Sequence, residues 1–358
     1  MSLTDVRLGE AEEPAAPAAG PSRRPAGGGG TWRFVGGQVL GSFLCLCFVV
    51  VLNFFLFRVI QGDPVRSLGR ARQMTPEAMA DLQELLGLNE PLWKQFVIYL
   101  KNTATGELGV SYQNGQPVAD IIQASLWPTL ALVGSATILA TIIGVWMGMR
   151  AAWRHGGMFD RVSTGGALLL YAAPEWWLGM LLMAVFAVGM GPFPGIFPTG
   201  GLHSPDVDPS SFTGVIDAMW HLTLPVITLT LGYLADYSLI MRSSLLDEMG
   251  QDYLTTARAK GLRDDLVRRR HAVPNAMLPT TTLIALSLGF VVSGSITIEI
   301  VFSIDGLGLL TLQAIEDIDR PLLQGLFLTF STCVIVANLI ANLLYGYIDP
   351  RVRTGRGA

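Results

Sequence analysis

Six long apolar segments constrain the fold of this chain more than any other feature of its sequence. Each is long enough to cross a hydrocarbon layer of about 30 Å as a helix. The mean hydropathy is +0.46 and only 15% of the residues are charged, against roughly 25% in an average soluble protein. We therefore predict an all-α integral membrane protein with six transmembrane helices, at about residues 34–60, 126–149, 166–190, 220–241, 278–302 and 322–347.

The segments between these spans define the predicted organisation. Residues 1–31 are rich in Ala, Pro and Gly and have almost nothing to bury, which predicts a disordered cytoplasmic tail. Residues 32–125 contain the first span and a polar segment that we place outside the cytoplasm. Residues 126–353 contain the other five spans and form the membrane core, with a polar loop at 247–279. Residues 354–358 form a short C-terminal tail.

Proline and glycine residues punctuate the polar segments. Pro76 and Pro91 are expected to begin two short helices, and Gly87 to end the first of them. The segment at 106–118 predicts turns and an extended piece. The Pro- and Gly-rich segment at 191–211 predicts an irregular loop.

The distribution of positive charge predicts the orientation in the membrane. Seventeen of the 24 Lys and Arg residues lie in the N-terminal tail, at 150–161, at 242–270 and at the C-terminal end. Only six lie in the three loops on the opposite side. Because cytoplasmic loops carry the excess of Lys and Arg, both termini and the loop at 247–279 are expected in the cytoplasm.

The loop at 247–279 is the longest strongly polar run between two apolar segments. In a helix, Tyr253, Ala257 and Gly261 are spaced at i, i+4 and i+8 and share one face. Two small residues leave that face low enough for another surface to approach, and Gly261 suits a helix C-cap. We predict a short helix with a flat docking face; the alternative is an ordinary basic loop.

The spacing in this loop resembles the coupling loop of ATP-binding-cassette importer permeases. That pattern is Glu-Ala-Ala, three residues, Gly, nine residues, then hydrophobic-x-hydrophobic-Pro. The departures are Thr255 for Glu, Thr256 for the first Ala, and His271 at a usually aliphatic position. The run TARAKGL and the later Asn-Ala-x-x-Pro are typical of the dipeptide, oligopeptide and nickel branch. The matching positions are Thr255, Thr256, Ala257, Gly261 and Pro274.

Further matches to the same branch occur in order along nearly the whole chain, from about residue 34 to residue 353. Glu299 corresponds to an acid that is typical of the branch. The other matches are Gly62-Asp63-Pro64, Gly87-Leu88, Gly106 to Tyr112, Gln116-Pro117-Val118, Ser293-Gly294, Val301-Phe302-Ser303, Gly306-Leu307-Gly308 and Asp349 to Arg353.

The resemblance implies a type I importer permease fold and a B-type subunit that forms half of a path for dipeptides or oligopeptides. It implies a bacterial cytoplasmic (plasma) membrane location, a second homologous permease, two ATPase subunits and an extracytoplasmic substrate-binding protein. A permease for nickel or another small solute is the alternative. The implied ATPase-coupling residues are Asp252, Tyr253, Thr256, Ala257, Lys260, Gly261 and Pro274.

No catalytic constellation is present in the sequence. None of the lysines, Lys94, Lys101 and Lys260, follows a Gly-rich phosphate loop, so ATP and Mg²⁺ are expected on partner chains and no cofactor on this one. The three cysteines lie in apolar runs and suggest neither a disulfide framework nor a metal site. The net charge of −4 argues against a nucleic-acid partner. We predict a transport subunit and not an enzyme.

Three acids in the predicted spans are candidates for a translocation path or gate, since a charge at a helix centre costs about 2.5–3.5 kcal/mol. Glu175 follows Pro174 near the middle of the third span. It either meets a substrate amine or cation, or is a protonated or bonded packing residue. We expect Asp236 to bond to Arg242 or to a neighbouring helix rather than to contact substrate. Glu299 is expected to make a structural or gating bond at the outer mouth.

Two other functions remain open from the residues alone. A stand-alone channel or ion-coupled carrier would use Glu175 and Asp236 and would transport without partners. A membrane scaffold would have no path, and neutralising Glu175 and Glu299 would leave solute uptake intact. Only the permease hypothesis requires two ATPase chains to co-purify.

Overall fold

The computed structural model describes residues 29–60, 75–85, 89–190, 193–293 and 295–348. Most of the predicted tail, two sequence matches (residues 62–64 and 87–88) and the chain from 349 onward lie outside the described residues. Within them the predicted helical class is confirmed, because helices dominate and the strands form one two-stranded sheet.

The first half of the chain contains long helices separated by short ones. In order these are α1 (Gly29–Phe54), η1 (Phe55–Ile60), α3 (Pro76–Leu85), α4 (Leu92–Thr105), α5 (Val118–Thr129), η2 (Leu130–Gly134), α6 (Ser135–Trp153), α7 (Met158–Ala172), α8 (Glu175–Met183) and η3 (Ala184–Val188).

The second half begins with a small antiparallel hairpin and the longest helix. The elements are β1 (Gly189–Met190), β2 (Phe193–Pro194), α9 (Phe212–Met249), α10 (Asp252–Ala259), α11 (Asp264–Val267), η4 (Arg268–Ala272), α12 (Val273–Phe290), η5 (Val291–Ser293), α13 (Ile296–Val301), α14 (Leu307–Glu316) and α15 (Arg320–Ile348).

The two predicted helix starts in the first polar segment agree with these bounds, while Gly87 lies outside the described residues. Pro76 is the first residue of α3, and Pro91 directly precedes α4. The segment at 106–118 forms turns with one isolated bridge between Val110 and Pro117. The segment after β2 is irregular until Ser211, whose Oγ accepts a hydrogen bond from the backbone N–H of Gly214 at 3.0 Å and caps α9.

Four helical stretches in the described residues are long and apolar enough to cross a membrane. A fifth is added if the bent pair α7 and α8–η3 is counted as one span. The chain is therefore a helical membrane protein. The four stretches are Phe34–Phe57, Val118–Trp153, Phe212–Met249 and Arg320–Leu343.

The predicted third span is not one straight helix. The axes of α7 and of the segment Glu175–Val188 meet at 101°. Ala173 is extended (φ −82°, ψ 128°) because the ring of Pro174 disfavours helical geometry in the residue before it. Glu175 thus starts a new helix instead of lying in the middle of an old one.

The predicted fifth span, at 278–302, is also interrupted. Helix α12 ends at Phe290, a 3-10 turn follows, and α13 begins only at Ile296. The break falls in a Ser-Gly-Ser sequence, whose residues have low helix propensity. Glu299 consequently belongs to a short separate helix.

The predicted second span is longer than expected, because α5, η2 and α6 form one continuous stretch from Val118 to Trp153. Pro128 lies inside it, and the π-helical turn η2 follows directly. A proline removes one backbone hydrogen bond, and a π-helical turn is a common local adjustment within a helix. The helix therefore passes the proline without ending.

Among the described helices, α6 and α9 share the most extensive contact. A Cβ atom on Gly144 would lie 2.8 Å from Cβ of Tyr237, and one on Gly148 would lie 2.5 Å from the carbonyl oxygen of Ser238. Two small residues four positions apart allow helices to approach this closely in a membrane.

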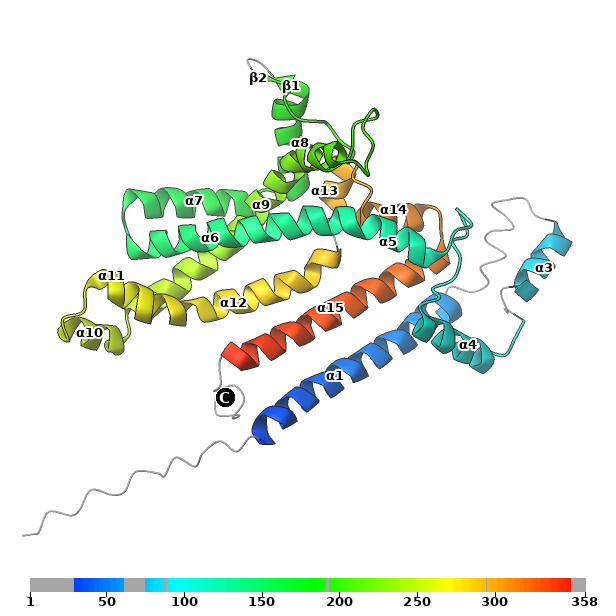
Figure 1. Cartoon of the computed structure of the whole chain (residues 1–358), viewed down its shortest axis with the longest axis horizontal. Helices are drawn as coiled ribbons and strands as arrows, with labels where there is room; N and C mark the ends of the chain where they lie inside the picture. Colours follow the sequence, from blue (N-terminus) through cyan, green and yellow to red (C-terminus); the bar gives the residue numbers. More distant parts are fainter. Residues whose placement is uncertain (1–28, 61–74, 86–88, 191–192, 294, 349–358) are drawn as a thin grey trace, which may run out of the picture.

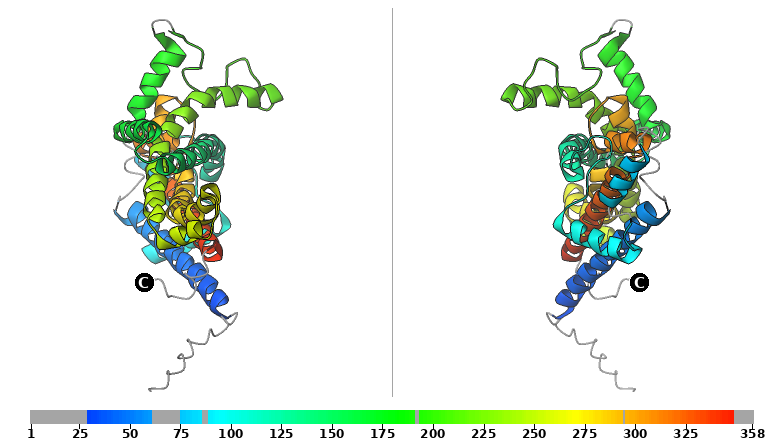
Figure 2. Two further views of the ribbon diagram at one scale, coloured as in Figure 1. Left: turned by 90° about the vertical axis from the view of Figure 1, so that its left-hand side faces the viewer. Right: turned by 90° about the vertical axis from the view of Figure 1, so that its right-hand side faces the viewer.

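Helices that are far apart in the sequence lie side by side in the bundle (Figure 1). Helix α1 lies beside α15, α15 beside α12, and α12 beside α9, while α7 covers α9 next to α6. Elements α10 and α11 lie at one end of the bundle, which we call the α10 end, and α4 and α14 lie toward the opposite, α14 end. The first turns of α9 project sideways from the other helices (Figure 2).

Candidate functional site

The α10–η4 loop, residues 250–272, contains the short helix that the sequence predicted. Helix α10 buries Leu254 and Ala257 against Leu245 at the end of α9 and against Val267 and Ala272 farther along the loop. These apolar contacts fix the helix to its own chain. The loop is therefore a packed element at the end of the bundle.

Helix α10 ends in a Schellman motif, as the predicted C-cap requires. Gly261 has φ +81°, a conformation that costs least for glycine. Its N–H donates to the carbonyl of Arg258 at 2.9 Å, and the N–H of Leu262 donates to the carbonyl of Ala257 at 3.3 Å. Any other residue at 261 would strain this cap, although no atom occupies the space of its Cβ.

The predicted docking face of Tyr253, Ala257 and Gly261 is wrong in one respect. Ala257 is only 7% exposed and packs inward, so it cannot contact a second protein. A buried small residue allows α10 to lie close to its own bundle. The surface that α10 leaves open includes Tyr253 and Arg258 together with Asp252, Thr255, Thr256, Ala259 and Lys260.

Tyr253 joins α10 to the end of α9 and to α12. Its hydroxyl donates to Glu248 Oε1 at the end of α9 and accepts from Asn275 Nδ2 of α12 at 2.8 Å. Asn275 Nδ2 also donates to the carbonyl of His271 at 3.1 Å. Burial, followed by the hydrogen bond to Glu248, raises the pKa of the Tyr253 phenol above its ordinary value. The phenol therefore stays protonated and keeps its donor near neutral pH.

The remaining predicted coupling residues lie on the surface of the same loop. Thr256 Oγ1 donates to the carbonyl of Asp252 at 3.2 Å, and both residues are exposed. Lys260 is the exposed C-cap of α10. Pro274 is the second residue of α12, where a missing backbone N–H costs nothing. The structure thus brings all seven predicted residues to one end of the bundle.

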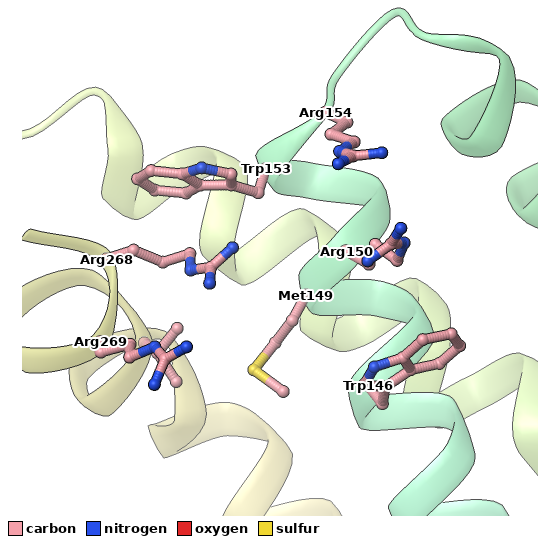
Figure 3. A pocket seen from close by; sticks show the side chains of 8 residues that line it. Trp146, Met149, Arg150, Trp153, Arg154, Arg268 and Arg269 are labelled. Atoms are coloured by element: carbon pink, nitrogen blue, oxygen red, sulfur yellow. The ribbon is translucent and has the colours of Figure 1, made fainter. Parts of the chain in front are cut away.

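The basic end of the loop is tied to α6. Asp265 pairs with Arg268 at 2.9 Å and with Arg269 at 3.2 Å. The guanidinium of Arg268 lies 5.4 Å from the ring centre of Trp153 at the end of α6 (Figure 3). A cation over an aromatic face is attracted by the ring quadrupole, so this contact stabilises the packing of η4 against α6.

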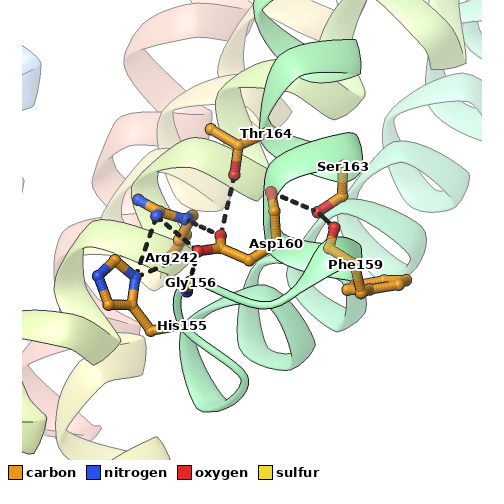
Figure 4. Close-up of polar contacts among 7 residues, drawn as sticks. All are labelled: His155, Gly156, Phe159, Asp160, Ser163, Thr164 and Arg242. Carbon is orange, nitrogen blue, oxygen red and sulfur yellow. Dashed lines mark hydrogen bonds and ion pairs between the residues drawn. The ribbon is translucent and has the colours of Figure 1, made fainter.

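Arg242 of α9 pairs with Asp160 of α7 and not with Asp236, which corrects one predicted alternative. The Arg242 Nε atom lies 2.6 Å from Asp160 Oδ1, and Nη2 lies 3.1 Å from Oδ2 (Figure 4). The backbone N–H of Gly156 and the side chain of Thr164 also donate to this nearly buried carboxylate. The pair braces α7 against α9.

Glu175 and Asp236 lie near each other without a basic partner in the described part of the chain. A Cβ atom on Gly232, one helical turn before Asp236, would lie 3.2 Å from Glu175 Oε1. The two carboxylates are close enough to interact electrostatically, with Glu175 half-buried and Asp236 exposed. The bend at Pro174 places Glu175 there. Two acids on one side of the bundle can attract a cation or an amine.

Glu299 is fully buried and bonds to the backbone and to Thr129 of α5. Thr129 Oγ1 donates to Oε1 at 2.9 Å, and the N–H of Leu309 donates to Oε2 at 3.0 Å. A Cβ atom on Gly306 or Gly308 would lie 2.5 or 2.9 Å from a carboxyl atom of Glu299. The glycines therefore make room for this carboxylate and its bonds, while a structural or gating role at an outer mouth stays a prediction.

Asp160 and Thr129 are polar partners of Arg242 and Glu299 that the sequence reasoning missed. Their partners are 82 and 170 residues away in the chain, so no local spacing reveals them. In the described residues there is no group of three His, Cys, Asp or Glu side chains that could hold a metal ion.

The long apolar helices, with the packed α10–η4 loop at one end of their bundle, define the class of a multi-span helical membrane protein. The sequence matches the model of the binding-protein-dependent transport system inner membrane component over residues 140–354. It also matches the N-terminal membrane component of such systems over residues 31–133. The chain belongs to this family of inner membrane transport components.

Three relatives illustrate the similarity. The dipeptide transport system permease protein of Alkalihalophilus pseudofirmus is 35% identical, with 85% of this chain and 94% of the relative covered. The dipeptide permease of Escherichia coli is 36% identical, with 88% and 96% covered. A glutathione transport system permease protein of Escherichia coli is also 36% identical, with 88% and 97% covered.

Proposed function

We propose that this chain is the permease subunit of an ATP-driven peptide importer, and that the α10–η4 loop receives the force of ATP hydrolysis. The observation that carries the proposal is the construction of this loop. Its helix is packed inward through Leu254 and Ala257, capped by Gly261 and tied to two long helices by Tyr253. An element fixed in this way moves together with α9 and α12 when a partner pushes it.

The proposed partners follow from this role. Two ATPase subunits bind ATP and Mg²⁺ and contact the exposed surface of α10. A second homologous permease completes a type I core of six spans per subunit, and an extracytoplasmic binding protein delivers the peptide. The proposed orientation has both termini and the α10 end in the cytoplasm, where the positive charges of the loops are concentrated.

The acid pair Glu175 and Asp236 is proposed to face the path between the two permeases. Peptides carry an N-terminal amine, and two carboxylates on an open side of the bundle offer it a counter-charge. Glu299 is proposed to hold the far end of the path closed through its buried bonds. A dipeptide or oligopeptide substrate is supported by the names of the relatives, two of which are dipeptide permeases.

Exchange of Thr256 for arginine tests the proposed contact with an ATPase. Thr256 is exposed on α10, and within the described residues its hydroxyl bonds to the backbone of its own helix alone. An arginine there should reduce ATP-dependent dipeptide uptake into proteoliposomes by about tenfold, because overpacking costs about 1–3 kcal/mol and about 1.4 kcal/mol is a factor of ten.

The matched control is Thr105→Arg on α4. Thr105 is likewise exposed and bonds to its own helix backbone at 3.2 Å, but it lies toward the α14 end. Uptake should remain normal in this control. Normal uptake and normal ATPase co-purification in Thr256→Arg would refute the proposed contact.

A further inference from the structure

A basic cleft lies beside the α10–η4 loop at the end of α6 (Figure 3). It has a volume of about 540 Å³. Arg150 and Arg154 reach it from α6 on one side, and Arg268 and Arg269 from η4 on the other, with Met149 between them. We call it the arginine cleft; its lining residues are Trp146, Met149, Arg150, Trp153, Arg154, Arg268, Arg269 and Val273.

The charges of the arginine cleft are not balanced within the described residues. Asp265 pairs with Arg268 and Arg269. No described carboxylate lies within ion-pair distance of Arg150 or Arg154, so four guanidinium groups share one acid. Such a cluster attracts an anion, and guanidinium groups match phosphate oxygens through paired N–H donors.

Aromatic rings hold two of these arginines in place. Arg268 stacks over Trp153, and the guanidinium of Arg150 lies 5.8 Å from the ring centre of Trp146 and 5.3 Å from that of Phe159. Stacking fixes the guanidinium plane and leaves its edge free to donate hydrogen bonds. Tryptophans at the end of a membrane helix also mark the boundary between lipid and water.

An apolar ridge on α6 leads directly into the cleft. Ile138, Ile142, Trp146, Arg150 and Arg154 follow one another at intervals of four residues and form one ridge along the helix. Ile138 and Ile142 are 57% and 63% exposed, and both belong to the apolar stretch Val118–Trp153. A molecule with an anionic head and an apolar tail matches both the arginines and the ridge, whereas a soluble anion matches only the arginines.

We propose that the arginine cleft binds the phosphate headgroup of an anionic phospholipid, with an acyl chain along the ridge of Ile138 and Ile142. The bound phosphate bridges α6 to η4, which directly precedes α12. The lipid therefore adds a connection between the α10–η4 loop and the continuous helical stretch Val118–Trp153. This proposal rests on the membrane location of the family and not on the identity of the imported solute.

The test compares lipid retention by the purified protein, with its partner subunits, from nanodiscs of phosphatidylcholine with and without phosphatidylglycerol. Native mass spectrometry counts the lipids that remain bound. We expect wild-type protein to retain phosphatidylglycerol in preference to phosphatidylcholine, and the double variant Arg150→Gln with Arg154→Gln to retain about tenfold less. Lipid retention can be measured even if no peptide is transported, so it fails or succeeds independently of the proposed function.

Two variants control for charge and for folding. Arg161→Gln removes the same charge from an exposed position of α7 outside the cleft and should leave retention unchanged. Arg150→Lys with Arg154→Lys keeps the charge and should retain most of the phosphatidylglycerol. A loss in the glutamine variant alone, with an unchanged size-exclusion profile, supports a headgroup site.

Three results would overturn the proposal. Wild-type protein without any preference for phosphatidylglycerol excludes an anionic lipid site, whatever the variants do. Displacement of bound lipid by inorganic phosphate, with no effect of the apolar ridge variant Ile142→Asn, indicates a site for a free anion. Unchanged lipid retention with loss of the ATPase subunits from the double glutamine variant indicates a protein interface.

Discussion

The two ends of the helix bundle hold their turns in different ways. At the α14 end, the carboxylates of Glu299 and Asp319 are buried and accept hydrogen bonds from backbone N–H groups and from hydroxyls. At the α10 end, Tyr253 and its partners Glu248 and Asn275 form exposed bonds. Buried polar networks are costly to break, while exposed ones contribute little to stability.

The α14 end therefore contributes mainly to the stability of the fold, and the α10 end offers a surface for contact with a partner. The α14 end fixes α5, α13, α14 and α15 to one another with groups that no other protein can reach. The α10 end leaves the polar surface of a capped helix open and buries the apolar side chains of Leu254 and Ala257. We therefore expect mutations at the α14 end to unfold the protein, and mutations at the α10 end to spare the fold and impair transport.

The largest effect is expected for Glu299→Ala. The change leaves the N–H of Leu309 and the hydroxyl of Thr129 without their acceptor, and each unpaired buried group costs about 1–3 kcal/mol. The midpoint of thermal unfolding in detergent should fall markedly. Glu316→Ala, at an exposed position of the same region, should leave the midpoint unchanged. Equal midpoints for the two variants would contradict a buried structural role of Glu299.

A smaller loss of stability is expected for Asp319→Ala. Asp319 precedes α15 and accepts from the N–H of Leu322 at 3.3 Å, from the N–H of Gln113 at 3.2 Å and from the hydroxyl of Ser111. Loss of a helix N-cap typically costs about 1 kcal/mol, and the unpaired Ser111 adds to that. Thermal unfolding measures the change. Asp317→Ala, at a neighbouring exposed position, is the control and should have no effect.

The smallest effect on stability is expected for Tyr253→Phe. The ring stays in place, and only exposed hydrogen bonds to Glu248, to Asn275 and to the carbonyl of His271 are lost, so unfolding should shift by less than about 1 kcal/mol. Uptake per ATP hydrolysed should nevertheless fall, because α10 is then less firmly tied to α9 and α12. Normal coupling in this variant would mean that the apolar contacts of Leu254 and Ala257 transmit the force alone.

The sequence predicted the helical class and the location of the α10–η4 loop because both depend on local patterns. Apolar length reports a membrane helix, and the φ of Gly261 follows from its place after a short helix. The same patterns did not reveal the direction in which Ala257 points. A face of small residues has the same sequence pattern whether it packs on its own bundle or on a partner protein.

The interruptions of the spans were partly visible in the sequence. Pro174 and the Ser-Gly-Ser stretch at 293–295 are weak helix positions, but Pro128 is another and the helix continues through it. Whether a proline bends a helix depends on what surrounds the freed carbonyl groups. Local propensity alone does not contain that information.

By itself the sequence determined that this chain has membrane-length helices, a capped polar loop between two of them, and acids in or near the apolar segments. Only the tertiary structure decided which distant side chains contact one another. Arg242 pairs with Asp160 and not with Asp236, Glu299 bonds to Thr129, and Glu175 lies beside Gly232. The physical reason is the distance along the chain over which each interaction acts. Helix length and caps are set by residues within a few positions, whereas a buried charge is stabilised by whatever distant group the packing of the helices brings to it.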